Sequence, residues 1–277
     1  MKKILLLGGT GFIGRNILPL LQKDYDIVAP KHHELDLSNK KMVDDYLTVN
    51  SFDVLVNVAL AKWNADLWKY AGEIVRCFLS LENNADKFEK ILYIGSGAEY
   101  DKSSDIKMAE EDNIGTTIPQ VPYAFAKYVL NTIARKSKNI YNLRLFGCYG
   151  PFDKKWRFIY HCIECCLKKE PITIEQDCYF DYLFIEDLAG IIRWFVENKP
   201  NYHDYNITTG QPANLTAIAK LVTEKMENNR EIVISKEGLN YEYTASNKRL
   251  LNEMGSFDFT SLNIGIDKQI LWQRGIK

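Results

Sequence analysis

Tyr123 and Lys127 lie four residues apart in the segment PYAFAK, and side chains of these types can transfer a proton. Residues at i and i+4 share one face of a helix, so the Lys127 ammonium is expected near the Tyr123 phenol. A free tyrosine has a pKa of about 10 and is a poor acid at neutral pH, but a neighbouring cation lowers that pKa towards the working range. Because the same spacing also occurs on ordinary solvated helices, its meaning depends on the other motifs of the chain.

A glycine-rich segment follows the first apolar run, Ile4–Leu7, and precedes residues with helical periodicity. It reads GGTGFIG from Gly8 to Gly14, with glycines in the pattern GxxGxxG. Glycines at this spacing permit a tight turn, close approach of backbone to a pyrophosphate, and close packing of helix on strand. The N–H groups at the start of the helix would then face the phosphates. The segment predicts a dinucleotide site, the alternative being a simple glycine turn, and Pro19 should bend or shorten the helix.

The composition favours an enzyme in aqueous solution. With 277 residues, 46% of them hydrophobic, the chain can bury one large core or a main and a smaller domain. Its apolar runs are too short to span a membrane, and Lys2 and Lys3 precede too few aliphatic residues for a signal peptide. The net charge is −1 and the basic residues are spread evenly, which argues against a nucleic-acid partner. We therefore expect a cytoplasmic protein with no membrane or nucleic-acid partner.

The six cysteines are expected to be reduced thiols, because no export signal accompanies them. Three of them fall in the segment HCIECC and invite a metal-binding interpretation. On a helix, Cys162 and Cys166 share one face while His161 and Cys165 share another, so the four do not converge on a tetrahedral site. We expect no metal, and the cysteines fit buried positions as small hydrophobes.

Strand-like and helix-like segments alternate along the chain, which predicts an α/β fold with a doubly wound parallel sheet of the Rossmann type. The strand candidates are Ile4–Leu7, Asp26–Ala29, Val54–Val58, Ile91–Ile94, Tyr141–Leu145 and Leu183–Ile185. The helix candidates are Ile13–Gln22, Lys40–Val49, Leu67–Leu81, Tyr123–Lys136, Ile159–Lys168, Asp187–Glu197 and Leu215–Asn228. We expect residues 1–165 to form the dinucleotide-binding domain, with 180–210 returning to it. Residues 166–277 would form a smaller substrate-binding lobe without a large core of its own.

Seven motifs in order carry a resemblance to a known family. They are GGTGFIG, VNVA (56–59), IGSGAEYD (94–101), PYAFAK (122–127), LRLFGCYGP (143–151), FDYLFIEDLA (180–189) and YNITTGQP (205–212). Together they resemble the extended short-chain dehydrogenase/reductases of the sugar-nucleotide type, the NAD-dependent epimerase/dehydratase family. This family includes 4-epimerases, 4,6-dehydratases and 4-ketoreductases, and its fold alone does not select among these reactions.

The resemblance implies a role for each matching residue. Ser96 would bind the substrate carbonyl oxygen, Tyr123 would exchange the proton, and Lys127 would also hold the nicotinamide ribose. The cofactor contacts it implies, beyond Tyr123 and Lys127, are Gly8, Thr10, Gly11, Phe12, Ile13, Gly14, Asp36, Leu37, Ala59, Leu60, Ala61, Phe146 and Cys148. The substrate contacts it implies, beyond Ser96, are Trp156, Arg157 and Asp181. Alternatives remain: Ser96 as a turn residue, 154–157 as an ordinary basic loop, and Asp181 as a structural residue.

The chain departs from the family pattern beside the serine. Dehydratases of this family carry an acidic pair directly after it, where this chain has Gly97 and Ala98. Ala98 also stands where GDP-fucose synthase has the cysteine that exchanges protons during epimerisation. Glu99 follows, and strand alternation would aim it away from the site. Dehydration and 3,5-epimerisation are therefore not expected, which leaves 4-ketoreduction or 4-epimerisation.

The end of the second strand concerns the choice of cofactor. NAD-specific members have a carboxylate there that binds the adenosine ribose. This chain has Lys31, His32 and His33 there, which would accommodate the 2′-phosphate of NADP. The acidic Glu34 follows them, and the alternative is that these residues form an ordinary solvated loop. We expect NADP, with NAD as the second choice, and an NADPH-dependent reductase of a nucleotide-linked 4-keto-6-deoxy sugar. An NAD-dependent sugar-nucleotide 4-epimerase and a non-catalytic NADP-binding regulatory protein stay open.

The helices expected at Leu67–Leu81 and Tyr123–Lys136 match two that relatives pair across a two-fold axis. The resemblance therefore implies a homodimer with a four-helix interface.

Overall fold

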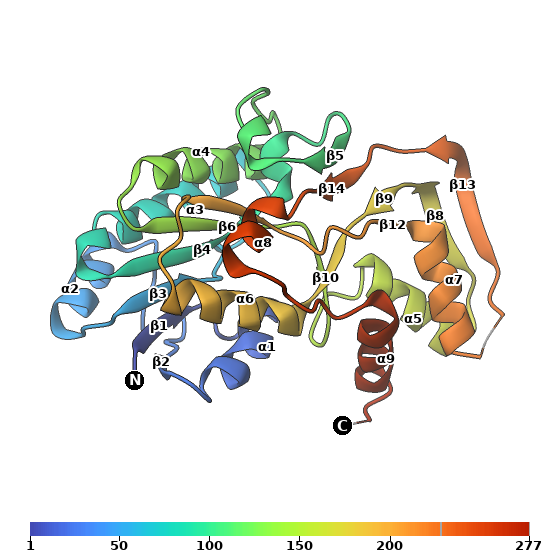
Figure 1. The fold of residues 1–277 in the computed structure, drawn as a ribbon, viewed down its shortest axis with the longest axis horizontal. Coiled ribbons are helices and arrows are strands. Elements are labelled where there is room, and N and C mark those ends of the chain that lie inside the picture. Colours follow the sequence, from blue (N-terminus) through green and yellow to red (C-terminus); the bar gives the residue numbers. More distant parts are fainter. Residues whose placement is uncertain (228, 277) are drawn as a thin grey trace.

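The computed structural model describes residues 1–227 and 229–276, and its main feature is a parallel sheet in the order β11-β6-β4-β3-β1-β2 (Figure 1). Each neighbouring pair in this sheet is parallel. The strand order reverses between β1 and β3, as in a doubly wound Rossmann-type sheet, which confirms the predicted fold class. Its strands are β1 (Lys3–Leu7), β2 (Asp26–Val28), β3 (Val54–Asn57), β4 (Lys90–Ser96), β6 (Ile140–Leu145) and β11 (Asp204–Ile207).

Helices cover both faces of the sheet because its strands are apolar on both faces. Along β1, Ile4 and Leu6 enter one core while Leu5 and Leu7 enter the other, as strand alternation requires. The first core lies under α1 (Phe12–Leu21) and α6 (Ile185–Glu197). The second lies under α2 (Lys40–Val49), α3 (Leu67–Glu82) and α4 (Pro122–Lys136). Because all neighbouring strands are parallel, their carboxyl ends lie on the same side of the molecule.

Three predicted elements differ from the structure. The predicted strand Leu183–Ile185 is wrong as a member of the main sheet: β10 (Tyr182–Phe184) pairs with β7 (Gly147–Tyr149), and the last sheet position belongs to β11. Helix α1 continues through Pro19 and ends at Leu21, so the proline does not break it. Helix α7 (Leu215–Lys225) ends before the predicted limit, and residue 228 itself lies outside the described residues.

The C-terminal lobe stands beside the sheet (Figure 1) and has an apolar core, which in the described residues is smaller than either core that flanks the sheet. This core joins buried residues of α5 (Phe158–Lys168), α7 and α9 (Leu262–Gln273). Helix α5 crosses the predicted boundary at 165/166 and packs into the core of the lobe. The strands of the lobe are β8 (Ile172–Asp177), β9 (Tyr179–Phe180), β12 (Ala213–Asn214), β13 (Ile232–Leu239) and β14 (Tyr243–Ala245).

One sheet ties this lobe to the nucleotide-binding half. Its order is β12-β9-β14-β5, where β5 (Ile106–Ala109) belongs to the segment that follows β4. The remaining elements are α8 (Lys248–Met254) and the 3₁₀ turns η1 (Ala85–Lys87), η2 (Gly97–Tyr100) and η3 (Glu111–Asn113). Strand β14 pairs with β5, which follows β4 in the chain, so this pairing places the C-terminal segment near the end of β4.

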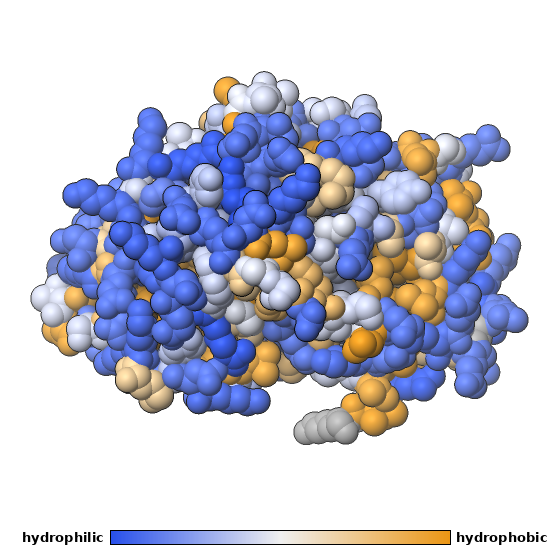
Figure 2. All heavy atoms as spheres, in the orientation of Figure 1, coloured by the Kyte–Doolittle hydropathy of each residue, from blue (hydrophilic) through white to orange (hydrophobic). Residues whose placement is uncertain are grey.

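The surface is mainly hydrophilic on the face shown in Figure 2, with apolar side chains gathered chiefly over the C-terminal lobe. Across residues 1–227 and 229–276, no helix combines the length and apolar character needed to cross a membrane.

Candidate active site

A cavity of about 960 Å³ opens at the carboxyl edge of the sheet, where ligands of open α/β sheets bind. This volume is at the upper end of the range for ligand sites, about 300–1,000 Å³, and suits a long ligand such as a dinucleotide. The structure brings together nearly all the residues that the sequence predicted for the site. The predicted residues that line the cavity are Gly8, Thr10, Gly11, Phe12, Ile13, Asp36, Leu37, Ala59, Leu60, Ala61, Ser96, Tyr123, Lys127, Phe146, Cys148, Trp156 and Arg157.

The glycine loop has the geometry of a phosphate cradle. Gly8 has a φ of +87°, and a Cβ there would lie 2.7 Å from the backbone nitrogen of Ala59. A Cβ at Gly14 would collide with the Gly8 carbonyl oxygen, so Gly14 does not line the cavity but allows α1 to pack against the loop. Helix α1 begins at Phe12 with Gly11 as its N-cap, and no side chain caps its first N–H groups. Because Gly11, Phe12 and Ile13 line the cavity, these N–H groups are available to an anion there. These features fit a dinucleotide pyrophosphate.

The catalytic candidates come from β4 and α4. Ser96 is the last residue of β4, and Pro122 opens α4 at a position where the missing N–H costs nothing, which places Tyr123 in the first turn. The Tyr123 phenol lies within hydrogen-bonding reach of the Ser96 hydroxyl. One turn further on, the Lys127 ammonium is 6.0 Å from the centre of the Tyr123 ring. The three side chains thus form one group at the cavity wall.

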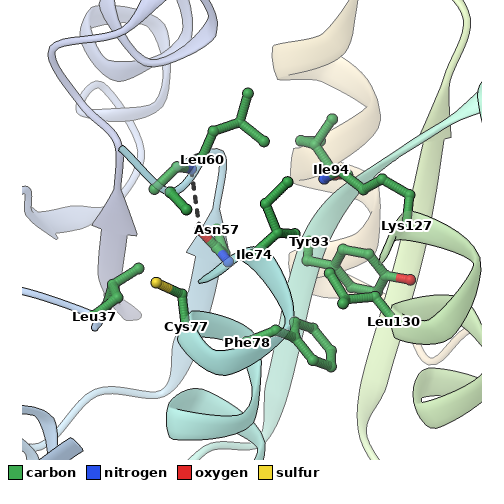
Figure 3. Close-up of a pocket in the computed structure, with 12 residues that line it drawn as sticks. Leu37, Asn57, Leu60, Ile74, Cys77, Phe78, Tyr93, Ile94, Lys127 and Leu130 are labelled. Carbon is green, nitrogen blue, oxygen red and sulfur yellow. Dashed lines mark hydrogen bonds between the residues drawn. The ribbon is translucent and has the colours of Figure 1, made fainter. Parts of the chain in front are cut away.

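Lys127 is only 5% exposed, and its Nζ donates a hydrogen bond of 2.7 Å to the carbonyl oxygen of Ile94. Figure 3 shows its side chain extending towards Ile94 among the residues that line a small pocket. Burial lowers the pKa of Lys127 to about 8. Burial also raises the pKa of Tyr123 to about 12, partly offset by its hydrogen bond with Ser96. The expectation that Lys127 lowers the pKa of Tyr123 is therefore wrong for this structure, and Tyr123 is protonated at neutral pH.

A buried ion pair fixes the turn that follows Ser96. Glu99 accepts a hydrogen bond of 2.8 Å from the Ser96 backbone N–H and another of 2.8 Å from Arg144 Nε. Both side chains are fully buried, and Arg144 also donates to Asp204 on β11 at 2.7 Å. Glu99 therefore points away from the cavity, as the sequence predicted, and cannot act on a substrate. Sequence reasoning missed Arg144 although it stands in the motif LRLFG.

Besides Gly14, two predicted site residues, Lys31 and Asp181, lie outside the cavity. Lys31 is exposed, and its backbone N–H donates to Glu34 at 2.6 Å. The basic side chains that do line the cavity include His32, Lys69 and Arg76, and the charges of His32 and Arg76 act on the Asp36 carboxylate. Sequence reasoning missed Arg76 and Lys69 because they stand on α3, away from the loop where a 2′-phosphate contact was sought.

Asp181 is fully buried, and its Oδ1 accepts hydrogen bonds from both the backbone N–H and the hydroxyl of Thr209, at 3.0 and 2.5 Å. It connects the segment before β10 to the loop that follows β11. The predicted substrate contact at Asp181 is thus replaced by a structural role, which the sequence analysis had left as the alternative.

The loop after β7 carries the remaining predicted contacts. Trp156 is 73% exposed at the rim of the cavity, where its ring is open to stacking. Arg157 donates to the Cys148 carbonyl oxygen at 2.9 Å and pairs with Asp153 at 3.4 Å. Burial raises the pKa of Asp153 to about 6. Arg157 therefore both fastens the loop and lines the cavity.

In the described ranges, 1–227 and 229–276, no group of three or more His, Cys, Asp or Glu side chains could hold a metal ion. His161 and Cys165 contact each other, with 3.5 Å between the sulfur and Nε2, on the lobe helix α5.

A nucleotide cradle joined to a Ser–Tyr–Lys group defines an oxidoreductase-type site, and comparison with known proteins specifies the class. The model of the NAD dependent epimerase/dehydratase family matches residues 4–208, so the chain belongs to this family of NAD(P)-dependent sugar-nucleotide enzymes. The GDP-L-colitose synthase of Yersinia pseudotuberculosis is 25% identical over 96% of both chains. The ADP-L-glycero-D-manno-heptose-6-epimerase of Brachyspira hyodysenteriae is 24% identical, also over 96% of both.

Solved structures with low sequence identity share the fold. A GDP-L-fucose synthetase from Naegleria fowleri bound to NADP superposes with a TM-score of 0.85 at 15% identity, covering 99% of this chain and 93% of that one. The GDP-mannoheptose C4 reductase MlghC from Campylobacter jejuni, with NADP bound, gives a TM-score of 0.82 at 17% identity over 99% and 98%. A dTDP-glucose 4,6-dehydratase from Bacillus anthracis in complex with NAD gives 0.84 at 16% over 99% and 97%. Structural neighbours thus include proteins solved with either nicotinamide cofactor.

Proposed function

We propose that the protein is an NADPH-dependent reductase that converts the C4 ketone of a nucleotide-linked 4-keto-6-deoxy sugar to an alcohol. The observation that carries this proposal is which side chains surround Ser96, where the substrate ketone would bind. Ser96, Tyr123 and Lys127 are together, while the two positions after Ser96 are Gly97 and Ala98, which have no group for proton chemistry. This set suffices for adding a hydride and one proton, and it lacks the acid–base pair that dehydration uses.

The protein's own residues supply the proton for the reduction and hold the ketone oxygen that receives it. When bound, the nicotinamide supplies the hydride. Ser96 holds the ketone oxygen through its hydroxyl, and Tyr123, which burial keeps protonated, donates its proton to the alkoxide that forms. The buried Lys127 lines the cavity beside the tyrosine and, in this proposal, binds the ribose hydroxyls of the cofactor. A tyrosine that is protonated at neutral pH suits reduction, because reduction begins with the phenol as acid.

Relatives and site chemistry support a nucleotide-diphosphate sugar as the substrate. Two relatives are named GDP-L-colitose synthase and CDP-abequose synthase, both of which carry a nucleotide-linked sugar in their names. At the rim of the cavity, Trp156 offers a stacking surface and Arg157 a positive charge, which suit a base or sugar ring and a diphosphate. We infer NADP as the cofactor, since His32 and Arg76 line the cavity near Asp36, and NAD is the second choice.

We also infer a homodimer formed through α3 and α4. These helices lie side by side, with the Trp68 and Phe125 rings 5.8 Å apart. Leu67, Trp68 and Leu79 on α3 and Val121 at the start of α4 are exposed apolar residues, which a second copy of the chain would cover.

A substrate panel tests the proposed function. Purified protein is freed of small molecules, and NADPH oxidation is followed with GDP-, CDP-, dTDP- and UDP-linked 4-keto-6-deoxy sugars. Oxidation by the parent and not by Tyr123→Phe supports the reductase. Retention of tightly bound NAD, with interconversion of UDP-sugars and no net NADPH oxidation, would instead identify a 4-epimerase. NADPH binding without turnover of any sugar would favour a regulatory protein.

A further inference from the structure

Tyr243, from the C-terminal lobe, reaches the catalytic serine. It is the first residue of β14 and is only 7% exposed. Its hydroxyl oxygen lies 2.6 Å from the place that a Cβ on Gly97, the residue directly after Ser96, would take. A hydrogen bond with Ser96 opposes the rise that burial causes in the pKa of Tyr243, as it does in the pKa of Tyr123. Ser96 is thus flanked by two tyrosines, one from the helix of the sequence motif and one from a strand much later in the chain.

The space for this second tyrosine exists because position 97 has no side chain. A Cβ at Gly97 would lie 2.6 Å from the Tyr243 hydroxyl oxygen and 2.7 Å from the Phe146 ring. The φ of Gly97 lies outside the left-handed region, so the backbone itself does not require glycine there. The Tyr243 hydroxyl therefore occupies the volume that a side chain directly after the catalytic serine would fill.

The Tyr243 ring is held from several sides, so its hydroxyl has a defined position. The ring centre is 4.9 Å from that of Phe146 and 5.3 Å from that of Phe180. The Lys102 ammonium stands 4.0 Å from the ring centre, a cation–π distance. The pairing of β14 with β5 fixes the backbone beneath it. A phenol packed in this way serves as a fixed hydrogen-bond partner rather than a mobile one.

A hydrogen bond from Tyr243 would decide where the Ser96 hydroxyl proton points. A serine hydroxyl has one proton to donate and two lone pairs that accept. The Ala98 backbone N–H already donates to Ser96 Oγ at 3.2 Å. If Tyr243 donates as well, both acceptor positions are filled, and the Ser96 proton is left to point at Tyr123 and the position of the ketone oxygen.

We propose that Tyr243 is a positioning residue of the reaction, which orients the Ser96 hydroxyl as a donor towards the substrate oxygen. The proposal rests on the proposed function, because the oriented proton acts on the ketone of that reaction. It also makes the C-terminal lobe part of the catalytic site. Tyr243, on strand β14 of this lobe, would set the orientation of Ser96, which lies at the end of β4 in the nucleotide-binding half.

A double-mutant cycle between Tyr243→Phe and Ser96→Ala tests the proposal. Tyr243→Phe should lower kcat about tenfold with the KM for NADPH unchanged, since it misorients a donor whose complete removal commonly costs 10²–10³. In the Ser96→Ala background the same change should have almost no effect, because the group it acts through is gone. The matched control is Tyr149→Phe. It also removes a buried tyrosine hydroxyl, but one that has no hydrogen-bond partner among the described residues, so turnover should not change.

Equal losses for Tyr243→Phe in the parent and in the Ser96→Ala background would overturn the proposal, because a general packing defect is independent of the serine. A second readout does not depend on turnover: the Tyr123 phenol is titrated by NMR in protein with ¹³C-labelled tyrosine, its signal assigned with Tyr123→Phe. The chain from Tyr243 through Ser96 to Tyr123 predicts that Tyr243→Phe raises the Tyr123 pKa, and that it adds nothing to Ser96→Ala. If the parent reduces no sugar, the proposed function fails, while an unshifted Tyr123 signal in this titration separately rejects the role of Tyr243.

Discussion

Replacing Lys127 by methionine should stabilise the protein while abolishing its activity. The Lys127 ammonium is buried, and burial lowers its pKa from 10.5 to about 8. At pH 7 this difference between the unfolded and folded states costs the folded protein about 3 kcal/mol. Methionine removes that cost but also removes the hydrogen bond to Ile94, which is worth about 1 kcal/mol. We therefore expect a net gain of about 2 kcal/mol at pH 7.

The pH dependence of this gain follows from the direction of the shift. Between pH 8 and 10.5 the unfolded chain still binds the Lys127 proton while the folded protein has released it, so the stability of the parent rises with pH. The advantage of Lys127→Met should shrink across this window and be lost near pH 10.

Urea unfolding, followed by tryptophan fluorescence at pH 7 and at pH 10, measures both values. The exposed Lys138→Met serves as the control, with no change expected. A variant that is less stable than the parent at pH 7 would refute the reasoning, since it would mean that the ammonium is better solvated in the fold than in water.

Three further predictions concern turnover, cofactor choice and assembly. Tyr123→Phe should keep NADPH affinity in a fluorescence titration while stopped-flow turnover falls by ~10²–10⁴, and Ser96→Ala should cost less. Arg76→Glu should weaken NADPH binding about tenfold and NADH binding little, whereas Lys31→Glu should have the smaller effect because Lys31 lies outside the cavity; equal losses for both cofactors would contradict a 2′-phosphate contact. Light scattering at micromolar concentration should show a dimer for the parent and a monomer for Trp68→Glu.

Local patterns were enough to predict the sheet and most of the cavity. The apolar run Ile4–Leu7 and the glycines that follow it are contiguous, so their structure depends mainly on neighbouring residues. Tyr123 and Lys127 meet because four residues make about one helical turn. For these elements the physical cause is present in a short stretch of sequence, and the structure confirms their arrangement.

Contacts between distant segments were beyond the reach of these patterns. The orientation of Lys31 is set by a loop whose N–H bonds to Glu34, and a charge count cannot supply it. The approach of Tyr243 to Ser96 depends on the pairing of β14 with β5 and on the empty volume at Gly97. From the sequence alone, Gly97 is only a position without the acid of the dehydratases. The structure shows that its lack of a side chain admits a side chain from elsewhere.

The pair Glu99–Arg144 should be the most sensitive structural support of the site. Glu99 holds the Ser96 N–H, and among the side chains its carboxylate accepts from Arg144 and Asn142. Arg144→Met would leave this carboxylate, and that of Asp204, buried with less positive charge, which costs about 3–5 kcal/mol when one partner of a buried pair is removed.

Because part of this cost is the unpaired charge on Glu99, the double variant Arg144→Met with Glu99→Gln should recover part of the stability in urea unfolding. Gln keeps an oxygen that can accept from the Ser96 N–H, so the turn after the serine should survive in the double variant. A double variant less stable than Arg144→Met alone would show that Glu99 contributes through its charge to other groups, and not mainly as the partner of Arg144. The turn that presents Ser96 would then depend on a wider electrostatic network than this one pair.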